Sequence, residues 1–105
     1  PRRVQARGEA LLERLRGLAT RFECIGDVRG RGLMLGVDLV TGRASRDPDG
    51  ALALALMDYC RERGYLILPS GVYGNVVAIT PPFVITDEQL DGFFDVFEQG
   101  LGELA

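Results

Sequence analysis

The sequence predicts an α+β domain, in which an antiparallel sheet of about four strands carries helices packed on one face. Three observations predict it. The 105 residues suit a single domain, and 47% of them are hydrophobic and 26% charged, which is a globular composition. Apolar residues recur at helical spacing in three segments and alternate in the segments between them. Glycine and proline gather at the junctions, where turns are expected.

The first segment, residues 2–20, is predicted to be an amphipathic helix. Its apolar residues recur at spacings of three, four and seven, which places them along one side of a helix. Most of its arginines and glutamates fall outside that stripe, so we expect them on a solvated face. The stripe consists of Val4, Leu11, Leu15, Leu18 and the following Phe22.

The period then changes to that of strands. Residues 22–28 are expected to form a short strand broken by Gly26, and residues 29–32 (RGRG) a turn. Residues 33–40 are a strongly apolar strand with two largely apolar faces, which predicts cover on both sides or nearly so. Gly36 has no side chain to pack, which indicates a close approach to the backbone there.

A polar stretch leads into the second helix. Residues 41–50 (TGRASRDPDG) are rich in turn formers and predict a mobile loop. Asp47 and Pro48 suit the cap and the first position of a helix over residues 51–63. Gly64 stands where a left-handed helix terminator is expected.

The last third of the chain repeats this order. We expect a strand over residues 65–68, a glycine-rich loop over 69–75, and a strand over 76–80 that two prolines stop. Thr86, with Gln89 three residues on, predicts a capped helix start. The apolar positions of that helix are Leu90, Phe94, Phe97, Leu101 and Leu104.

The composition excludes several classes of protein. There is no histidine and no lysine, which removes Ser-His-Asp machinery, histidine-bound zinc, a Schiff-base nucleophile and a Walker-type phosphate lysine. A net charge of −3 argues against nucleic acid as a partner, and the apolar runs are too short to span a membrane. Cys24 and Cys60 are expected to be reduced thiols in a cytoplasmic protein.

Short motifs point to several residues. Gly30, Gly32 and Gly36 resemble a dinucleotide loop, but the last spacing is too long and a strand follows where a helix should begin. Arg29 and Arg31 either bind an anion or hold main-chain carbonyls or Asp27.

Asp38, inside an apolar strand, is expected at a sheet edge or paired with an arginine. Ser70 and Tyr73 lie in the glycine-rich loop, where ligand contact and turn formation are both open. No pair of carboxylates has a spacing that requires acid–base chemistry.

Two longer motifs carry a resemblance. Residues 25–39 (IGDVRGRGLMLGVDL) and 69–90 (PSGVYGNVVAITPPFVITDEQL) resemble the C-terminal small domain of class III pyridoxal-phosphate aminotransferases, especially 4-aminobutyrate aminotransferases. The resemblance implies that residues 1–105 are that small domain and that a large domain, absent here, holds pyridoxal phosphate. It further implies a homodimer when complete, no catalytic residue in this chain, and amine and 2-oxo acid substrates. The chain begins at Pro1, and we expect it to be a piece of a longer protein, inactive alone.

The same resemblance implies a substrate wall formed by Ser70, Gly71, Val72, Tyr73 and Ala78. At the position of Ala78, family members that act on carboxylated substrates usually have an arginine that clamps the carboxylate. Either the absent domain holds the substrate, or the substrate is an amine without that carboxylate, or the site is degenerate or engineered. The alternative function is a non-catalytic α+β module that binds a small ligand or self-associates.

Overall fold

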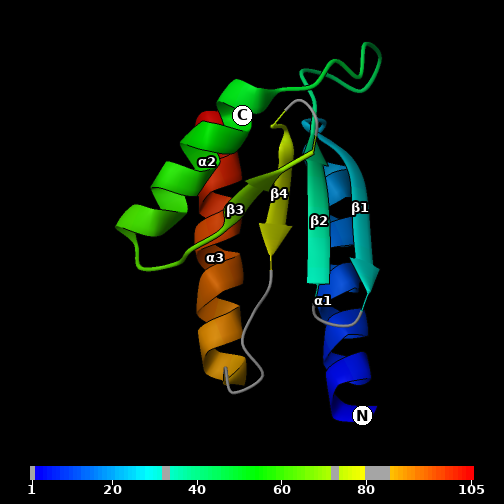
Figure 1. Cartoon of the computed structure of the whole chain (residues 1–105), viewed down its shortest axis with the longest axis vertical. Coiled ribbons are helices and arrows are strands. Elements are labelled where there is room, and N and C mark those ends of the chain that lie inside the picture. Colours follow the sequence, from blue (N-terminus) through cyan, green and yellow to red (C-terminus); the bar gives the residue numbers. More distant parts are fainter. Residues whose placement is uncertain (1, 32–33, 72–73, 80–85) are drawn as a thin grey trace.

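The computed structural model of the chain describes residues 2–31, 34–71, 74–79 and 86–105. The order of elements is helix, two strands, helix, two strands, helix, as the sequence predicts (Figure 1). Their bounds are α1 Arg2–Arg21, β1 Ile25–Arg31, β2 Met34–Leu39, α2 Gly50–Glu62, β3 Leu68–Ser70, β4 Val76–Ile79 and α3 Asp87–Leu104.

The four strands form one antiparallel sheet in the order β1-β2-β4-β3. Helices α1 and α3 lie behind the sheet in Figure 1, and α2 packs beside α3 near the β3 edge. The helices and one face of the sheet share a single hydrophobic core, so the predicted α+β fold with helices on one face is confirmed. The sheet contributes Ile25, Leu35, Val37, Leu39, Val77 and Ile79 to that core.

Helix α1 uses the predicted apolar stripe, and its described arginines and glutamates are exposed as expected, although two of the arginines also contact α3. Arg14 donates to Asp91 of α3 at 2.7 Å, and its guanidinium carbon lies 4.4 Å from the centre of the Phe94 ring. Arg21 pairs with Glu98 of α3 at 3.1 Å. Long arginine side chains therefore link α1 to α3. The stripe buries Leu11, Leu15 and Leu18 and half-buries Phe22, whereas the side chain of Val4 lies outside those that the structure describes.

Strand β1 continues through Arg31, so the prediction of a turn starting at residue 29 was wrong. Arg29 pairs with Gly36 of β2, and its side chain projects from the face that the helices leave uncovered. The arginines and glycines of this segment resemble a turn sequence, but a strand with one face exposed to solvent also accommodates both residue types.

The break expected at Gly26 is a shift of register between Ile25 and Asp27. A Cβ on Gly26 would lie 2.8 Å from Cγ1 of Val40. The missing side chain thus lets the chain leaving β2 pass close to the start of β1.

Strand β2 is covered on one face only by the described residues, which corrects the expectation of cover on both sides. Its buried face packs on the helices, whereas Gly36 and Asp38 are half-buried on the other. A Cβ on Gly36 would meet Val76 at 3.7 Å and Arg29 at 3.9 Å, which are ordinary contacts. No unusually close approach therefore exists at Gly36 among the described residues.

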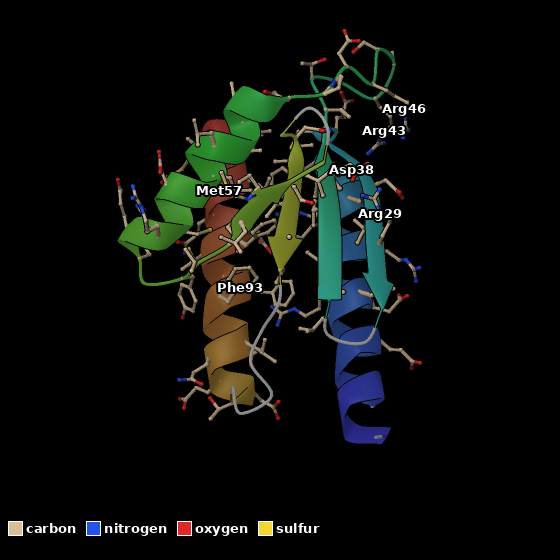
Figure 2. All side chains as sticks on the ribbon, viewed as in Figure 1. Arg29, Asp38, Arg43, Arg46, Met57 and Phe93 are labelled. Atoms are coloured by element: carbon tan, nitrogen blue, oxygen red, sulfur yellow. The ribbon has the colours of Figure 1, made fainter. Side chains whose placement is uncertain are left out.

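The segment expected as a mobile loop is tied down by hydrogen bonds. Val40 bridges to Pro48, and the amide of Thr41 donates to the carbonyl of Asp47 at 2.9 Å. Two side chains then reach back to the main chain of the first elements (Figure 2). Arg43 donates to the carbonyl of Ala19 at 2.7 Å, and Arg46 to that of Gly26 at 3.2 Å.

The cap of α2 is Asp49 and not the predicted Asp47. The carboxylate of Asp49 accepts the amide of Leu52 at 2.9 Å. Pro48 belongs to the bridge with Val40 and is not the first helical position; α2 begins at Gly50, within one residue of the predicted range 51–63. The predicted end is confirmed, because Gly64 has φ +92° and the amides that follow the helix close back on its last turn.

Strand β3 occupies Leu68–Ser70 and not residues 65–68. It pairs with β4 alone, so Pro69 sits on an edge strand, where its missing amide is tolerated. Strand β4 starts at the predicted Val76 and runs to Ile79. The predicted last residue of that strand, Thr80, lies outside the described residues.

Helix α3 begins with the predicted capping box. The Thr86 hydroxyl accepts the amide of Gln89 at 3.1 Å, and the Gln89 side chain accepts the amide of Thr86 at 2.9 Å. The predicted apolar positions are buried except Leu104, which is 40% exposed at the end of the helix. The sequence therefore predicts this helix closely.

Candidate functional site: the open face of the sheet

The sheet face opposite the helices, here called the open face, brings together side chains from all four strands. The strand register arranges them in two rows, and none of them is buried. The first row consists of Leu68, Ala78, Gly36 and Arg29, and the second of Ser70, Val76, Asp38 and Asp27.

The first row of the β3–β4 half of the open face carries apolar side chains, Leu68 and the short Ala78. Leu68 is 51% exposed, and the neighbouring Leu66 is 76% exposed. Between Leu68 and Arg29 the first row contains Ala78 and Gly36, so among the described residues of that row no side chain longer than a methyl group stands between them.

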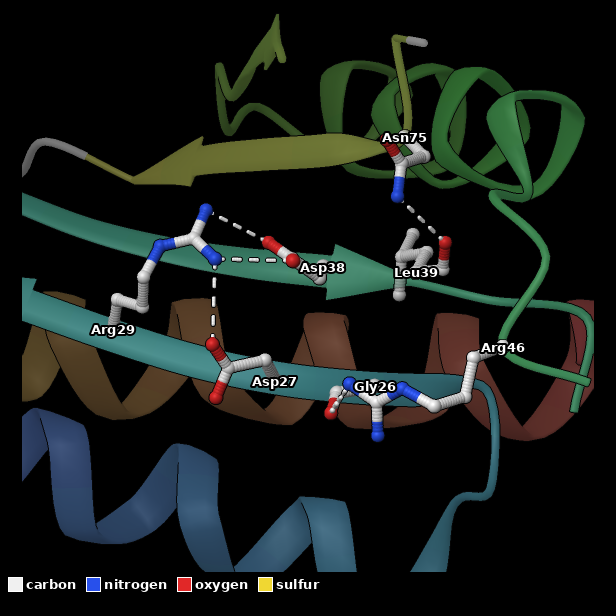
Figure 3. A network of polar contacts seen from close by, with 7 residues as sticks. All are labelled: Gly26, Asp27, Arg29, Asp38, Leu39, Arg46 and Asn75. Carbon is white, nitrogen blue, oxygen red and sulfur yellow. Dashed lines mark hydrogen bonds and ion pairs between the residues drawn. The ribbon is translucent and has the colours of Figure 1, made fainter. Parts of the chain in front are cut away.

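The β1–β2 half of the open face is charged. Nη1 of Arg29 donates to Oδ2 of Asp38 at 3.0 Å and to Asp27 at 3.3 Å (Figure 3). Nη2 lies 2.8 Å from the buried Oδ1 of Asp38 as an ion pair, but its N–H is not aimed at that oxygen, which accepts no hydrogen bond from the described residues. The hydrogen bond to Asp38 is the main cause that raises the pKa of Arg29.

This arrangement decides two predictions about charged residues. Of the two settings expected for Asp38, the pairing with an arginine is confirmed. The position at a sheet edge is not, because β2 is an inner strand. Arg29 holds carboxylates rather than a free anion, because one guanidinium faces two carboxylates and the cluster has a net charge of −1.

The predicted substrate residues are partly brought together. Ser70 is exposed and pairs with Val76, which stands two residues from Ala78 on the same face of β4. Gly71 is exposed and has φ +80°, and a Cβ on it would lie 2.8 Å from Cγ2 of Val76. Val72 and Tyr73 lie outside the described residues.

Ala78 and Val76 lie on one face of β4, opposite the buried Val77 and Ile79. It is half-buried and has Leu68 on one side and Gly36 on the other. Arg29 is the described cation in the same row, two strands away, and it is engaged by carboxylates. The described neighbours of Ala78 in its row, Leu68 and Gly36, are therefore apolar, and among the described side chains none stands ready to clamp a carboxylate there.

Three features in and around this face were missed or left open by the sequence interpretation. Leu68 is predicted to end a strand, but it begins one. An arginine partner is one of the two settings expected for Asp38, but Asp27, Arg29 and Arg31 lie close together in the sequence, which does not single out Arg29 as that partner. Asn75 was read as a loop residue, but its side chain donates to the carbonyl of Leu39 at 3.0 Å, and the residue is 8% exposed.

The described residues contain no group of three or more potential metal ligands. They also contain no helix long and apolar enough to cross a membrane. Cys24 and Cys60 are free, buried thiols, as expected. Burial raises the pKa of both, that of Cys60 to about 11, so neither is activated as a nucleophile.

The element that follows Gly30 and Gly32 agrees with the prediction that these glycines do not form a dinucleotide loop. Strand β2, and not a helix, follows the glycines. No helix N-terminus therefore stands where a pyrophosphate would need one.

This chain is similar in sequence and in structure to several known proteins. An alanine–glyoxylate aminotransferase 2 homolog from Arabidopsis thaliana is 42% identical over 92% of this chain and 20% of its own length. A 4-aminobutyrate aminotransferase from Mycobacterium leprae is 35% identical over 96% of the chain and 22% of its own length. The solved structure of an Arthrobacter phospholyase in complex with phosphoethanolamine superposes with a TM-score of 0.92 at 36% identity, covering 97% of this chain and 24% of that one.

The chain thus spans about a fifth to a quarter of the length of these relatives. Both long motifs and the whole sheet fall within the matched part. The aminotransferase class-III family matches residues 1–101, and the chain belongs to that family.

Proposed function

We propose that residues 1–105 are the C-terminal small domain of a pyridoxal-phosphate-dependent class III aminotransferase. The complete enzyme would transfer an amino group from an amine or an ω-amino acid to a 2-oxo acid, with its own large domain as the partner of this one. The family match over residues 1–101, in a chain that spans about a fifth to a quarter of its relatives, carries the proposal. A homodimer and a cytoplasmic location are expected of the complete enzyme.

The residues of this chain do not fit a pyridoxal phosphate site. The chain has no lysine to form the bond to the cofactor aldehyde. Among the described side chains of the open face, the guanidinium of Arg29 is already engaged by two carboxylates, so it offers no free cation for a phosphate. The cofactor therefore belongs to the large domain, and no catalytic residue is assigned here.

The role left to this chain is to bind and orient the substrate. The proposed substrate wall consists of Ser70, Gly71, Val72, Tyr73 and Ala78. Its described part combines an exposed hydroxyl with a low apolar surface beside Leu68 and Val76. Such a wall excludes water from the side of the substrate that it covers, while contacts from the rest of the enzyme select the reacting atom.

Ala78 points to the class of amino donor. With an apolar side chain at that position, this face favours an amine that carries no carboxylate there. 4-Aminobutyrate remains a candidate substrate provided that another residue holds its carboxylate.

The test compares the complete enzyme with its Ala78→Arg and Ala78→Met variants, where methionine is a long neutral control. We expect Ala78→Arg to raise kcat/KM for carboxylated over uncarboxylated amines by about tenfold or more, because an arginine–carboxylate bond is strong and directional. Ala78→Met should lower both. An unchanged preference in Ala78→Arg would contradict the role given to this position.

A second candidate is elimination of phosphate from a phosphorylated amino alcohol. The relative with a TM-score of 0.92 is a phospholyase solved with phosphoethanolamine, an amine without a carboxylate, which agrees with an alanine at position 78. Measuring inorganic phosphate released from phosphoethanolamine beside amino transfer to a 2-oxo acid separates the two reactions. Phosphate release without amino transfer would replace the first candidate by the second.

The 105-residue chain alone should be inactive in both assays, even with added pyridoxal phosphate, because it lacks the lysine. Turnover by the isolated chain would contradict this proposal. Ligand binding or self-association by the isolated chain, with no reaction in any longer form, would instead favour a non-catalytic module.

A further inference from the structure

Asn75 makes an unusual pair with Leu39 at the end of the β2–β4 ladder. The pairing of Asp38 with Val76 would continue to these two residues, and the amide of Leu39 does donate to the carbonyl of Asn75 at 2.9 Å. In an antiparallel hydrogen-bonded pair, the second main-chain amide normally returns the bond. Here the side chain of Asn75 returns it, since Nδ2 donates to the carbonyl of Leu39 at 3.0 Å (Figure 3).

The substitution of side chain for main chain has a geometric consequence. The backbone amide of Asn75 is released from the ladder, so the chain is able to turn away from β2 at this residue while its side chain keeps it attached. Gly74, immediately before it, has φ +64°, and its amide donates to the carbonyl of Gly71 at 3.3 Å. The chain therefore turns at Gly74, next to the residue whose side chain holds it to β2.

The same carbonyl of Leu39 also holds the start of α2. It accepts the amide of Asp49 at 2.9 Å, and the carboxylate of Asp49 caps the helix through the amide of Leu52. One main-chain oxygen thus joins the end of β2, the start of β4 and the first turn of α2. With two donors, both lone pairs of that oxygen are used.

Asn75 is the buried polar side chain of the described residues, at 8% exposure. A buried amide keeps such a position only when its polar atoms are bonded, and here the bond fixes one exit of the β3–β4 connection. The other exit is fixed by the pairing of Ser70 with Val76, against which Gly71 packs.

We infer that Asn75 is a positioning residue: it fixes the point at which the chain turns from Gly74 into β4, and with it the contact of Gly74 with Gly71, relative to Ala78, and it couples that turn to α2 through Leu39. The inference rests on the proposed function only for the statement that the β3–β4 connection contacts substrate. The hydrogen-bond coupling itself stands on the distances above.

Two variants of the complete enzyme test it. Asn75→Asp keeps the shape but replaces the donor by an oxygen that faces the Leu39 carbonyl, and Asn75→Leu removes all polarity. In both, we expect hydrogen exchange at the amides of Asp49 and Gly74 to accelerate about tenfold relative to the α3 amides, as the loss of one hydrogen bond predicts. We further expect KM for the amine to rise about tenfold with kcat changed far less.

Two controls separate this effect from charge and from general destabilisation. Gln99→Glu adds the same charge at an exposed site on α3. Thr86→Ala removes the α3 cap and lowers stability away from the β3–β4 connection. Neither control should move the Asp49 and Gly74 amides or KM.

The outcomes are distinct. Unchanged exchange at Asp49 and Gly74 in both variants overturns the coupling, and unchanged KM with accelerated exchange overturns the positioning role. If the unmodified enzyme transfers no amino group to any 2-oxo acid, the proposed function fails, while the exchange measurement still decides whether Asn75 couples β4 to α2.

Discussion

Arg29 reaches across the open face from β1 to Asp38 on β2, with Nη1 3.0 Å from Oδ2 and Nη2 2.8 Å from Oδ1. The contact passes beside Gly36, which pairs with Arg29 and has no side chain to block it. Asp38 is the less exposed partner, at 26% against 55% for Arg29. The pair therefore joins β1 to β2, the strand that borders the apolar half of the face.

The unequal burial of these partners gives the first prediction. Arg29→Ala leaves the half-buried Asp38 without its counter-ion, so we expect a loss of about 1–2 kcal/mol in the free energy of unfolding, below the cost of breaking a fully buried pair because water reaches the site. Asp27→Ala should cost less than about 0.5 kcal/mol, since both groups of that contact are exposed. Urea denaturation at neutral pH measures both.

A matched control for this pair is Arg61→Ala. Arg61 contacts Asp58 one helical turn away at 3.0 Å, and both side chains are more than half exposed. We expect a change within about 0.5 kcal/mol. If Arg29→Ala is no more destabilising than Arg61→Ala, the pair across the strands contributes nothing beyond a surface ion pair.

Helix positions were predictable from the sequence because their signals are local. The stripe of α1 and the capping box of α3 depend on residues three and four apart; the capping box is confirmed, and so is the stripe from Leu11 to Leu18. The errors concern residues whose setting depends on distant partners. Arg29 and Gly30 were assigned to a turn, yet β2 pairs with them, and no local signal records that pairing.

The difference between local signals and contacts with distant residues also explains the cap of α2, and it gives the second prediction. Asp47 and Asp49 are equivalent as local cap signals, but the bridge of Pro48 to Val40 selects Asp49. Asp49→Ala should therefore cost about 1 kcal/mol in the free energy of unfolding, and Asp47→Ala close to none. Thermal and urea denaturation of the two variants compare them directly. Equal losses would mean that the cap is shared or that neither residue supplies it.

Cys60 gives the third prediction, a dependence of stability on pH. The thiol is fully buried in α2, and burial raises its pKa from the ordinary 9.0 to about 11. Because the folded state holds this proton more tightly than the unfolded state, the stabilising effect is complete below pH 9 and is lost as the pH rises toward 11. Urea midpoints measured from pH 8 to 11 should fall more steeply for the unmodified chain than for Cys60→Ala.

The alanine variant is itself less stable, since it removes a buried sulfur, but that loss is the same at every pH. Only the difference in slope therefore reports the thiol. Parallel pH profiles for the two proteins would show that Cys60 ionises as easily in the folded state as in the unfolded state.

The candidate site was predictable in part for the same reason as the fold. Alternation along β4 places Ala78 and Val76 on one face, and the structure agrees. The neighbours of Ala78 come from β2 and β3, and a single sequence does not order strands within a sheet. The apolar setting of Ala78, and the attachment of Asn75 to Leu39, therefore became visible only with the strand order β1-β2-β4-β3.

The last prediction compares two helical glycines in different surroundings. Gly17 of α1 is exposed, and a Cβ there meets nothing within 4 Å, so Gly17→Ala should stabilise the fold by about 0.5–1 kcal/mol through the lower entropy of the unfolded chain. Gly100 of α3 is buried against α2, where a Cβ would lie 2.8 Å from Cδ1 of Leu56 and 2.9 Å from the ring of Tyr59.

Gly100→Ala gains the same helix propensity but must push α2 and α3 apart or force Leu56 and Tyr59 from their places. Overpacking of this kind typically costs about 1–3 kcal/mol, which exceeds the gain, so we expect a net loss of stability. Thermal unfolding of the two variants should shift in opposite directions from the unmodified chain. A stabilising Gly100→Ala would mean that α2 and α3 are less tightly packed than the distances at Gly100 indicate, because only a yielding contact absorbs a methyl group there without cost.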